Sequence, residues 1–203
     1  SFNRTQNQPR TSVRVSFFYA LEHQGEPECS SVLLLVGFAG GLQYIETMNQ
    51  DLKLFYQMVK NTRAGVLDWL ESLPQSTFLQ EHPDFAFGSL RNIYLHIADT
   101  YLGWVAEAGL GHAGRVLQAD SARDLRQIFN WVDDAVHQAL ETFTAPDEPR
   151  TRTLLGPLNH TQRWLILHPI THEFHHKGQA LALARILGHP HPGSPDTDLV
   201  PPV

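Results

Sequence analysis

Four side chains that can take part in metal chemistry lie within residues 171–179, THEFHHKGQ. They are His172, Glu173, His175 and His176, and they spell HExxH, the pattern in which two histidines bind zinc and the glutamate acts as general base. Imidazole also suits nickel. The segment therefore indicates a metal site, either that of a zinc protease or that of another helical metalloprotein.

Helical spacing limits which histidines can share one ion. At about 100° per residue, His168, His172 and His176 advance by only about 40° per step, so they lie on one face of a helix. A rise of about 1.5 Å per residue separates the first from the last by roughly 12 Å, so these two cannot both reach one ion at about 2.0–2.1 Å. Either His168 with His172 or His172 with His176 can form a pair, and a third ligand must come from another element.

The protease interpretation lacks its third ligand. Zinc proteases of this type continue as HExxHxxGxxH or supply a glutamate further along the chain. Here Ala182 stands where that histidine would be, and residues 177–203 contain no glutamate. We therefore expect no protease activity, and we expect Glu173 to face solvent or to support a ligand. His175 projects to the flank, where it would support a neighbour or pack.

Composition restricts the classes of function. The chain has 203 residues, of which 42% are hydrophobic and 18% charged, as in an ordinary globular protein. Lysine and arginine number 15 against 21 acidic residues, a net charge of -6, and without a dense basic run we expect no nucleic-acid ligand. The single cysteine, Cys29, excludes an intrachain disulfide framework and a multi-thiolate zinc site. A metal ion would have to use histidine and carboxylate ligands.

The elements that position these residues are expected to be helices. Apolar residues recur at helical spacing over about 48–72, 85–108, 122–144 and 161–187. Ser121 and Asp124 form a capping-box pattern, and Pro169 must kink the last helix or mark where its main part begins. No segment after residue 48 alternates convincingly with period two, so no strand is expected there. The predicted fold is an all-α antiparallel four-helix bundle, with a long connection allowed between the second and third or between the third and fourth helices.

The first 47 residues lack this pattern, so we expect an irregular N-terminal extension (1–47) ahead of the bundle domain (48–203). The apolar run at 32–42, VLLLVGFAGGL, is too short to span a bilayer, and acidic GEPE precedes it where a secretion signal would be basic. Met48 is the expected biological start, with a real accessory segment before it as the alternative. Without a secretion signal, and with one cysteine, a cytoplasmic location is expected.

Two segments together resemble the DinB/YfiT-like group of damage-inducible four-helix-bundle metalloproteins. They are LHIADTYLGW (95–104) and LHPITHEFHHKGQ (167–179), and the resemblance extends over about residues 48–200, including the closing DTDLV. In that family one histidine of the second helix and an HxxxH pair ahead of an Arg/Lys-Gly-Gln run bind a divalent metal. The resemblance implies the ligands His96, His172 and His176 in this chain. Lys177 stands where arginine is commoner.

The residues around His96 leave its role open when they are considered alone. His96 lies at the margin of an apolar helical stripe, where a half-buried packing histidine is the alternative to a ligand. Asp99, three residues later, would either orient the imidazole or face solvent. Tyr94, Tyr101 and Trp104 are expected in the core.

Three imidazoles leave a divalent ion its full charge and at least one open position, as in catalytic sites. Zinc and nickel both suit imidazole and are the expected ions. Relatives of the resembled family include S-transferases that join low-molecular-weight thiols, such as bacillithiol or mycothiol, to electrophiles, and thiol-linked isomerases. The resemblance thus implies thiol transfer to a small molecule first. A metal-dependent hydrolase and a non-catalytic metal-binding stress-response protein are alternatives. The residues do not indicate an oligomeric state, although members of the resembled family often pair as homodimers through bundle faces.

Overall fold

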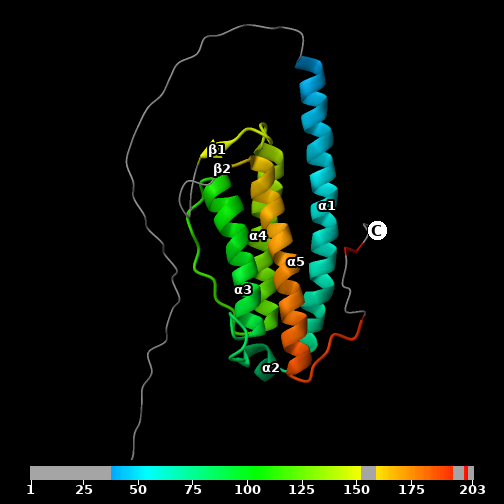
Figure 1. The fold of residues 1–203 in the computed structure, drawn as a ribbon, viewed down its shortest axis with the longest axis vertical. Helices are drawn as coiled ribbons and strands as arrows, with labels where there is room; N and C mark the ends of the chain where they lie inside the picture. Colours follow the sequence, from blue (N-terminus) through cyan, green and yellow to red (C-terminus); the bar gives the residue numbers. More distant parts are fainter. Residues whose placement is uncertain (1–37, 152–158, 194–198, 201–203) are drawn as a thin grey trace, which may run out of the picture.

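The computed structural model describes residues 38–151, 159–193 and 199–200, so most of the expected N-terminal extension lies outside the described residues. The helices are α1 (Phe38–Ser72), α2 (Gln75–Leu79), α3 (Leu90–Tyr101), the π-helix η1 (Leu102–Gly109), α4 (Ala122–Thr142) and α5 (Gln162–Ile186). The four long helical segments lie side by side as a bundle (Figure 1). The predicted all-α four-helix fold is confirmed.

The direction of the helices follows from the lengths of their connections. Figure 1 shows α3 and α4 running the same way, while α1 and α5 run the opposite way. The connection at 110–121 makes this possible, because it returns along the bundle before α4 begins. It is the long connection that the sequence allowed between the second and third predicted helices. As a result α3 and α5 are antiparallel neighbours, and these two helices carry the histidines of interest.

Helix starts agree with local capping chemistry, with two differences from prediction. The capping box is present, since the Asp124 carboxylate accepts from the Ser121 backbone N–H at 2.9 Å. α3 begins later than expected, because Gly88 has a φ of 74° and Ser89 then caps the helix by accepting from the Asn92 N–H at 3.2 Å. α1 begins at Phe38, ten residues before Met48. Once the amphipathic part of the helix has formed, adding residues at its N-terminal end needs no second nucleation step.

The last helix is continuous from Gln162 to Ile186. Pro169 lies inside it and therefore does not mark its start. The Thr161 hydroxyl caps it by accepting from the Trp164 N–H at 3.1 Å. The sequence did not predict η1, α2 or the antiparallel pairing of β1 (Arg150–Thr151) with β2 (Asn159–His160), which is only two residues long.

The core lies between the four long helices and contains aromatic side chains at the level of the histidines. Tyr94, Tyr101 and Trp104 are buried, as predicted. The core also contains charged groups, because Arg63 and Glu173 are each only 4% exposed. In the described part of the chain, no helix is both long enough and apolar enough to cross a lipid bilayer.

Candidate metal centre

Three histidines from two helices come together on one side of the bundle. His172 and His176 lie one turn apart on α5, and His96 reaches them from α3. One nitrogen from each ring can be chosen so that all three lie within 4.8 Å of one another. His168 is outside this group, so the pair on α5 is His172 with His176. The structure brings together the three residues that the resemblance implied.

The separations of the ring nitrogens suit one small cation. The Nε2 atoms of His96 and His172 are 2.8 Å apart. Two ligands at about 2.0–2.1 Å from a tetrahedral ion lie about 3.3 Å apart. The observed nitrogen–nitrogen distances, from 2.8 Å to at most 4.8 Å, include this value. Without a cation, two neutral rings can face each other so closely only if one Nε2–H donates to the other. This donor set therefore fits a divalent ion.

The environment keeps these imidazoles neutral. Burial, and then the proximity of His176, lower the pKa of His96 to about 4. Burial, followed by the neighbouring histidines, lowers the pKa of His172 to about 4 as well. Burial also lowers the pKa of His176. At neutral pH metal binding therefore needs no net loss of a proton from these rings, only a change of tautomer in the ring whose Nε2 carries the hydrogen.

Gln179 orients one of the three rings. Its Oε1 lies 2.8 Å from His176 Nδ1, and an amide oxygen only accepts, so Nδ1 carries the proton and donates. Nε2 of His176 is then the nitrogen with a free lone pair. The Gln179 amide in turn lies 3.2 Å from Nε2 of the exposed His175. His175 thus supports its neighbour indirectly, which is one of the two roles expected for it.

Phe87 covers one side of the histidine group, a contact that no sequence pattern predicted. Its ring stacks on His96 with a centroid separation of 4.1 Å and an interplanar angle of 20°. It also meets His176 edge-on at 5.2 Å. Phe87 belongs to the loop before α3, where no helical period could predict its direction. Its contacts restrict the movement of both rings and exclude water from that side.

A row of aromatic rings continues from the histidine group along α5. His168 lies 5.8 Å from His172 between ring centroids, and it stacks on Trp164 at 4.4 Å with an interplanar angle of 9°. Trp104 of η1 meets both rings edge-on, at 5.1 Å from Trp164 and 5.6 Å from His168. His168 is therefore a neighbour of the candidate centre, packed among tryptophans.

Glu173 corrects the sequence prediction, because it neither faces solvent nor contacts the histidine group. It is 4% exposed and lies in the core of the bundle. Arg63 of α1 donates to both of its oxygens, at 2.8 and 3.0 Å, and the Tyr101 hydroxyl donates at 2.7 Å. The physical reason is what packs against this side of α5: Glu173 is rotated by about 100° from His172, as in any helical HExxH, but here that direction meets Arg63 of α1 and Tyr101 of α3. A carboxylate held in this way is not available as a general base.

Asp99 takes the second of its two predicted roles. Its side chain is exposed. Within the described residues, no hydrogen bond joins it to His96. Its position on α3 therefore does not fix the tautomer of His96.

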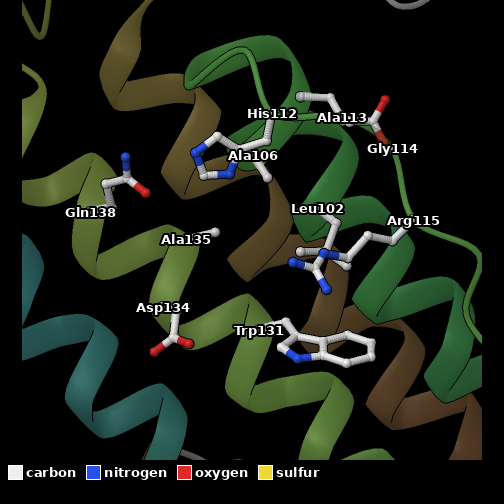
Figure 2. Close-up of a pocket in the computed structure, with 11 residues that line it drawn as sticks. Leu102, Ala106, His112, Ala113, Gly114, Arg115, Trp131, Asp134, Ala135 and Gln138 are labelled. Atoms are coloured by element: carbon white, nitrogen blue, oxygen red, sulfur yellow. The ribbon is translucent and has the colours of Figure 1, made fainter.

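A separate pocket of about 370 Å³ lies between η1, the start of the following connection, and α4. Figure 2 shows the Arg115 side chain in this pocket beside Trp131, and the guanidinium carbon lies 4.8 Å from the Trp131 ring centroid. Asp134 and His112 also line it. None of the three grouped histidines is among its lining residues, so this pocket is distinct from the candidate metal centre.

Comparison with known families agrees with the resemblance seen in the sequence. The model of the DinB family matches residues 48–198, which include all three grouped histidines. A search of curated proteins found no match to this chain. The family match begins at Met48 and covers more than half of the chain.

Proposed function

The chain belongs to the DinB family, and on that premise we propose that it is a metalloenzyme that activates a low-molecular-weight thiol. The observation that carries this proposal is the convergence of three imidazole nitrogens within 4.8 Å. The ion would be held by His96, His172 and His176. Zinc or nickel would suit this all-nitrogen donor set.

A divalent ion at this site would keep its full charge and would lower the pKa of a thiol or a water molecule that approaches it. Gln179 would keep the Nε2 lone pair of His176 directed to the ion through its contact with Nδ1. Phe87 would hold the ring of His96 and keep water away from one side. A substrate would therefore approach the ion from a side that Phe87 does not cover.

The position of Glu173 favours a thiol over water as the nucleophile. A free thiol has a pKa of about 8.5, far below that of water, so a thiol needs much less help to lose its proton. Hydrolysis by a protein with HExxH usually relies on the glutamate as general base. Here that carboxylate is bonded to Arg63 and Tyr101 in the core. A hydrolase is therefore the second candidate, and a non-catalytic metal-binding protein is the third.

The aromatic neighbours support a small organic substrate. Trp164 and His168 are half-buried; His168 lies beside His172, and Trp164 stacks on His168. Their rings offer a flat apolar surface next to the candidate centre, where the carbon skeleton of an electrophile could pack. We propose no peptide substrate, because the described residues offer no long strand along which a peptide could align.

Metal content tests the first part of the proposal. The protein is purified without a histidine tag and is analysed for bound metal beside His96→Ala, His172→Ala and His176→Ala. We expect about one divalent ion per wild-type chain and a large loss in each variant. Equal metal content in the wild type and all three variants would refute the assignment of the site.

Turnover tests the second part. The metal-loaded protein is assayed with a model electrophile in the presence and absence of low-molecular-weight thiols, with His172→Ala as the control. Thiol-dependent turnover that is absent in the variant is expected. Turnover of ester or amide substrates without thiol would favour the hydrolase, and tight metal binding without turnover in either assay would favour the non-catalytic alternative.

A further inference from the structure

We infer that Tyr101 is a positioning residue for the candidate metal centre, because its hydroxyl ties α3 to α5 on the side opposite the histidines. This inference rests on the proposed metal site. The bond from Tyr101 to Glu173 sets the separation at which His96 of α3 meets His172 and His176 of α5.

The bond and the histidine group join the same two helices. Tyr101 follows His96 by five residues on α3, and Glu173 directly follows His172 on α5. The Tyr101 hydroxyl donates to Glu173 Oε2 at 2.7 Å. Burial, and then the charge of Glu173, raise the pKa of Tyr101, so the hydroxyl keeps the proton that it donates. The helices are thus joined on the core side, behind the histidines.

The acceptor of this bond is itself fixed. Arg63 of α1 contacts both oxygens of Glu173 and also donates to Asp133 of α4 at 2.8 Å. Charge-assisted bonds of this kind are short and directional. Glu173 is therefore a rigid point, anchored to α1 and α4. Tyr101 contributes the hydrogen bond that connects α3 to that point.

Metal coordination is sensitive to the spacing of the two helices. Ligand distances have to fall within about 0.2 Å of their preferred values, and designed sites need their groups held to within about 0.5 Å. A change of a few tenths of an ångström in the distance between α3 and α5 moves His96 relative to the other two ligands by a similar amount. Loss of the Tyr101 bond should therefore weaken metal binding although Tyr101 touches no ligand ring.

A matched control is available on the same helix. Tyr94 is also buried on α3, at 1% exposure, and its ring meets Phe129 edge-on at 6.3 Å. Within the described residues, its hydroxyl has no hydrogen bond. Tyr94→Phe and Tyr101→Phe remove the same atom from the same helix, but only the second breaks a link between α3 and α5.

The test measures Co²⁺ affinity by titration, together with the visible spectrum of the bound Co²⁺, for wild type and both variants. We expect Tyr101→Phe to lose about 10-fold in affinity, the lower end for residues that support metal ligands, and to change the spectrum. Tyr94→Phe should retain both. Wild-type affinity and spectrum in Tyr101→Phe would overturn the inference.

Two further outcomes distinguish a change of ligand geometry from loss of fold, and failure of this inference from failure of the proposed function. The titrations are repeated in concentrated sucrose, which favours the folded state of every variant. A loss of Co²⁺ affinity that persists in sucrose comes from a changed ligand geometry and supports the inference. A loss that disappears in sucrose comes from partial unfolding and overturns the inference.

If the wild type binds no Co²⁺ at all, the proposed function fails, and this inference fails with it. If the wild type binds Co²⁺ and Tyr101→Phe binds it equally well, only the inference is overturned.

Discussion

The two faces of α5 use neighbouring residues in opposite ways. On the outer face, His172 is half-exposed and His176 is just buried, and both meet His96 as neutral rings; among the described residues no acidic side chain joins this group. On the inner face, Glu173 is charged, buried and bonded to Arg63 and Tyr101. The outer face is thus prepared to accept a cation, while the inner face already holds one in the form of Arg63.

This difference shows how a motif can mislead when the contacts around its helix are unknown. HExxH in a zinc protease requires the glutamate to act beside the two histidines. The same letters here place the carboxylate in the bundle core, where it stabilises the helices. The histidines and the glutamate therefore belong to two separate sites with different functions.

Removal of a ligand on the outer face should give the largest effect. His172→Ala is expected to lower metal affinity by on the order of 1,000-fold or more, since residues that only support ligands already contribute about 10- to 100-fold. Isothermal titration with Zn²⁺ measures the change. His168→Ala, one turn away and outside the group, is the control and should stay within about threefold of wild type. Similar losses in both variants would contradict the proposed ligand set.

Removal of the cation on the inner face should be the next largest effect. Arg63→Met leaves the buried Glu173 without its charged partner, so the free energy of unfolding should fall by about 3–5 kcal/mol. Urea unfolding of the metal-free protein measures it. Arg126 pairs with Asp68 and Glu71 at the surface, and Arg126→Met should cost under about 1 kcal/mol. Equal costs for the two arginines would show that the inner pair is not an essential part of the core.

Gln179 contacts His176 on the outer face but is not a ligand, so its removal should have a smaller effect on metal affinity. Gln179→Ala removes the acceptor that holds the proton on His176 Nδ1. Metal affinity should fall by about 10-fold, while the three ligands remain. Competition with a chromogenic chelator measures the affinity. Gln138, an exposed glutamine on α4, provides the control, and an equal loss in Gln138→Ala would show that the effect is not specific to the site.

The pH dependence of the metal-free protein should give the smallest effect, because His96 and His172 are only half-buried and solvent screens much of the effect of their pKa shifts on stability. His96 and His172 have folded-state pKa values of about 4, against an ordinary value of 6.5, chiefly because of burial. The unfolded chain therefore binds more protons between these values, and stability should decrease as pH falls from about 6.5 toward 4. Urea midpoints across this range measure the decrease. His172→Ala should show a shallower dependence, and an unchanged slope would contradict the assigned shifts.

Much of the fold could be predicted because its signal is periodic. Apolar stripes identified the four long helices, and Ser121 with Asp124 identified the start of α4 to the residue. The i, i+4 spacing identified pairs on α5, but it could not choose between His168 and His176 as the partner of His172. His96 needed the family resemblance, because the periodicity of one helix does not specify which residue of another helix it meets.

The remaining features depend on tertiary contacts that no local pattern encodes. Phe87 reaches the centre from a loop, and its direction depends on how that loop folds against α3. Glu173 was expected to face solvent or to support a ligand, and its burial could not be foreseen because its partner Arg63 lies 110 residues away in the sequence. The π-helical turns of η1 had no sequence signal that we could identify.

The central claim is that one divalent ion is held by three imidazoles and not by the neighbouring carboxylate. A crystal structure of the zinc-loaded protein, with anomalous diffraction measured on both sides of the zinc absorption edge, tests it most directly. We predict one strong anomalous peak about 2.0–2.1 Å from a ring nitrogen of each of His96, His172 and His176, with Glu173 still bonded to Arg63. A peak elsewhere, or one with the Glu173 carboxylate among its ligands, would contradict the claim.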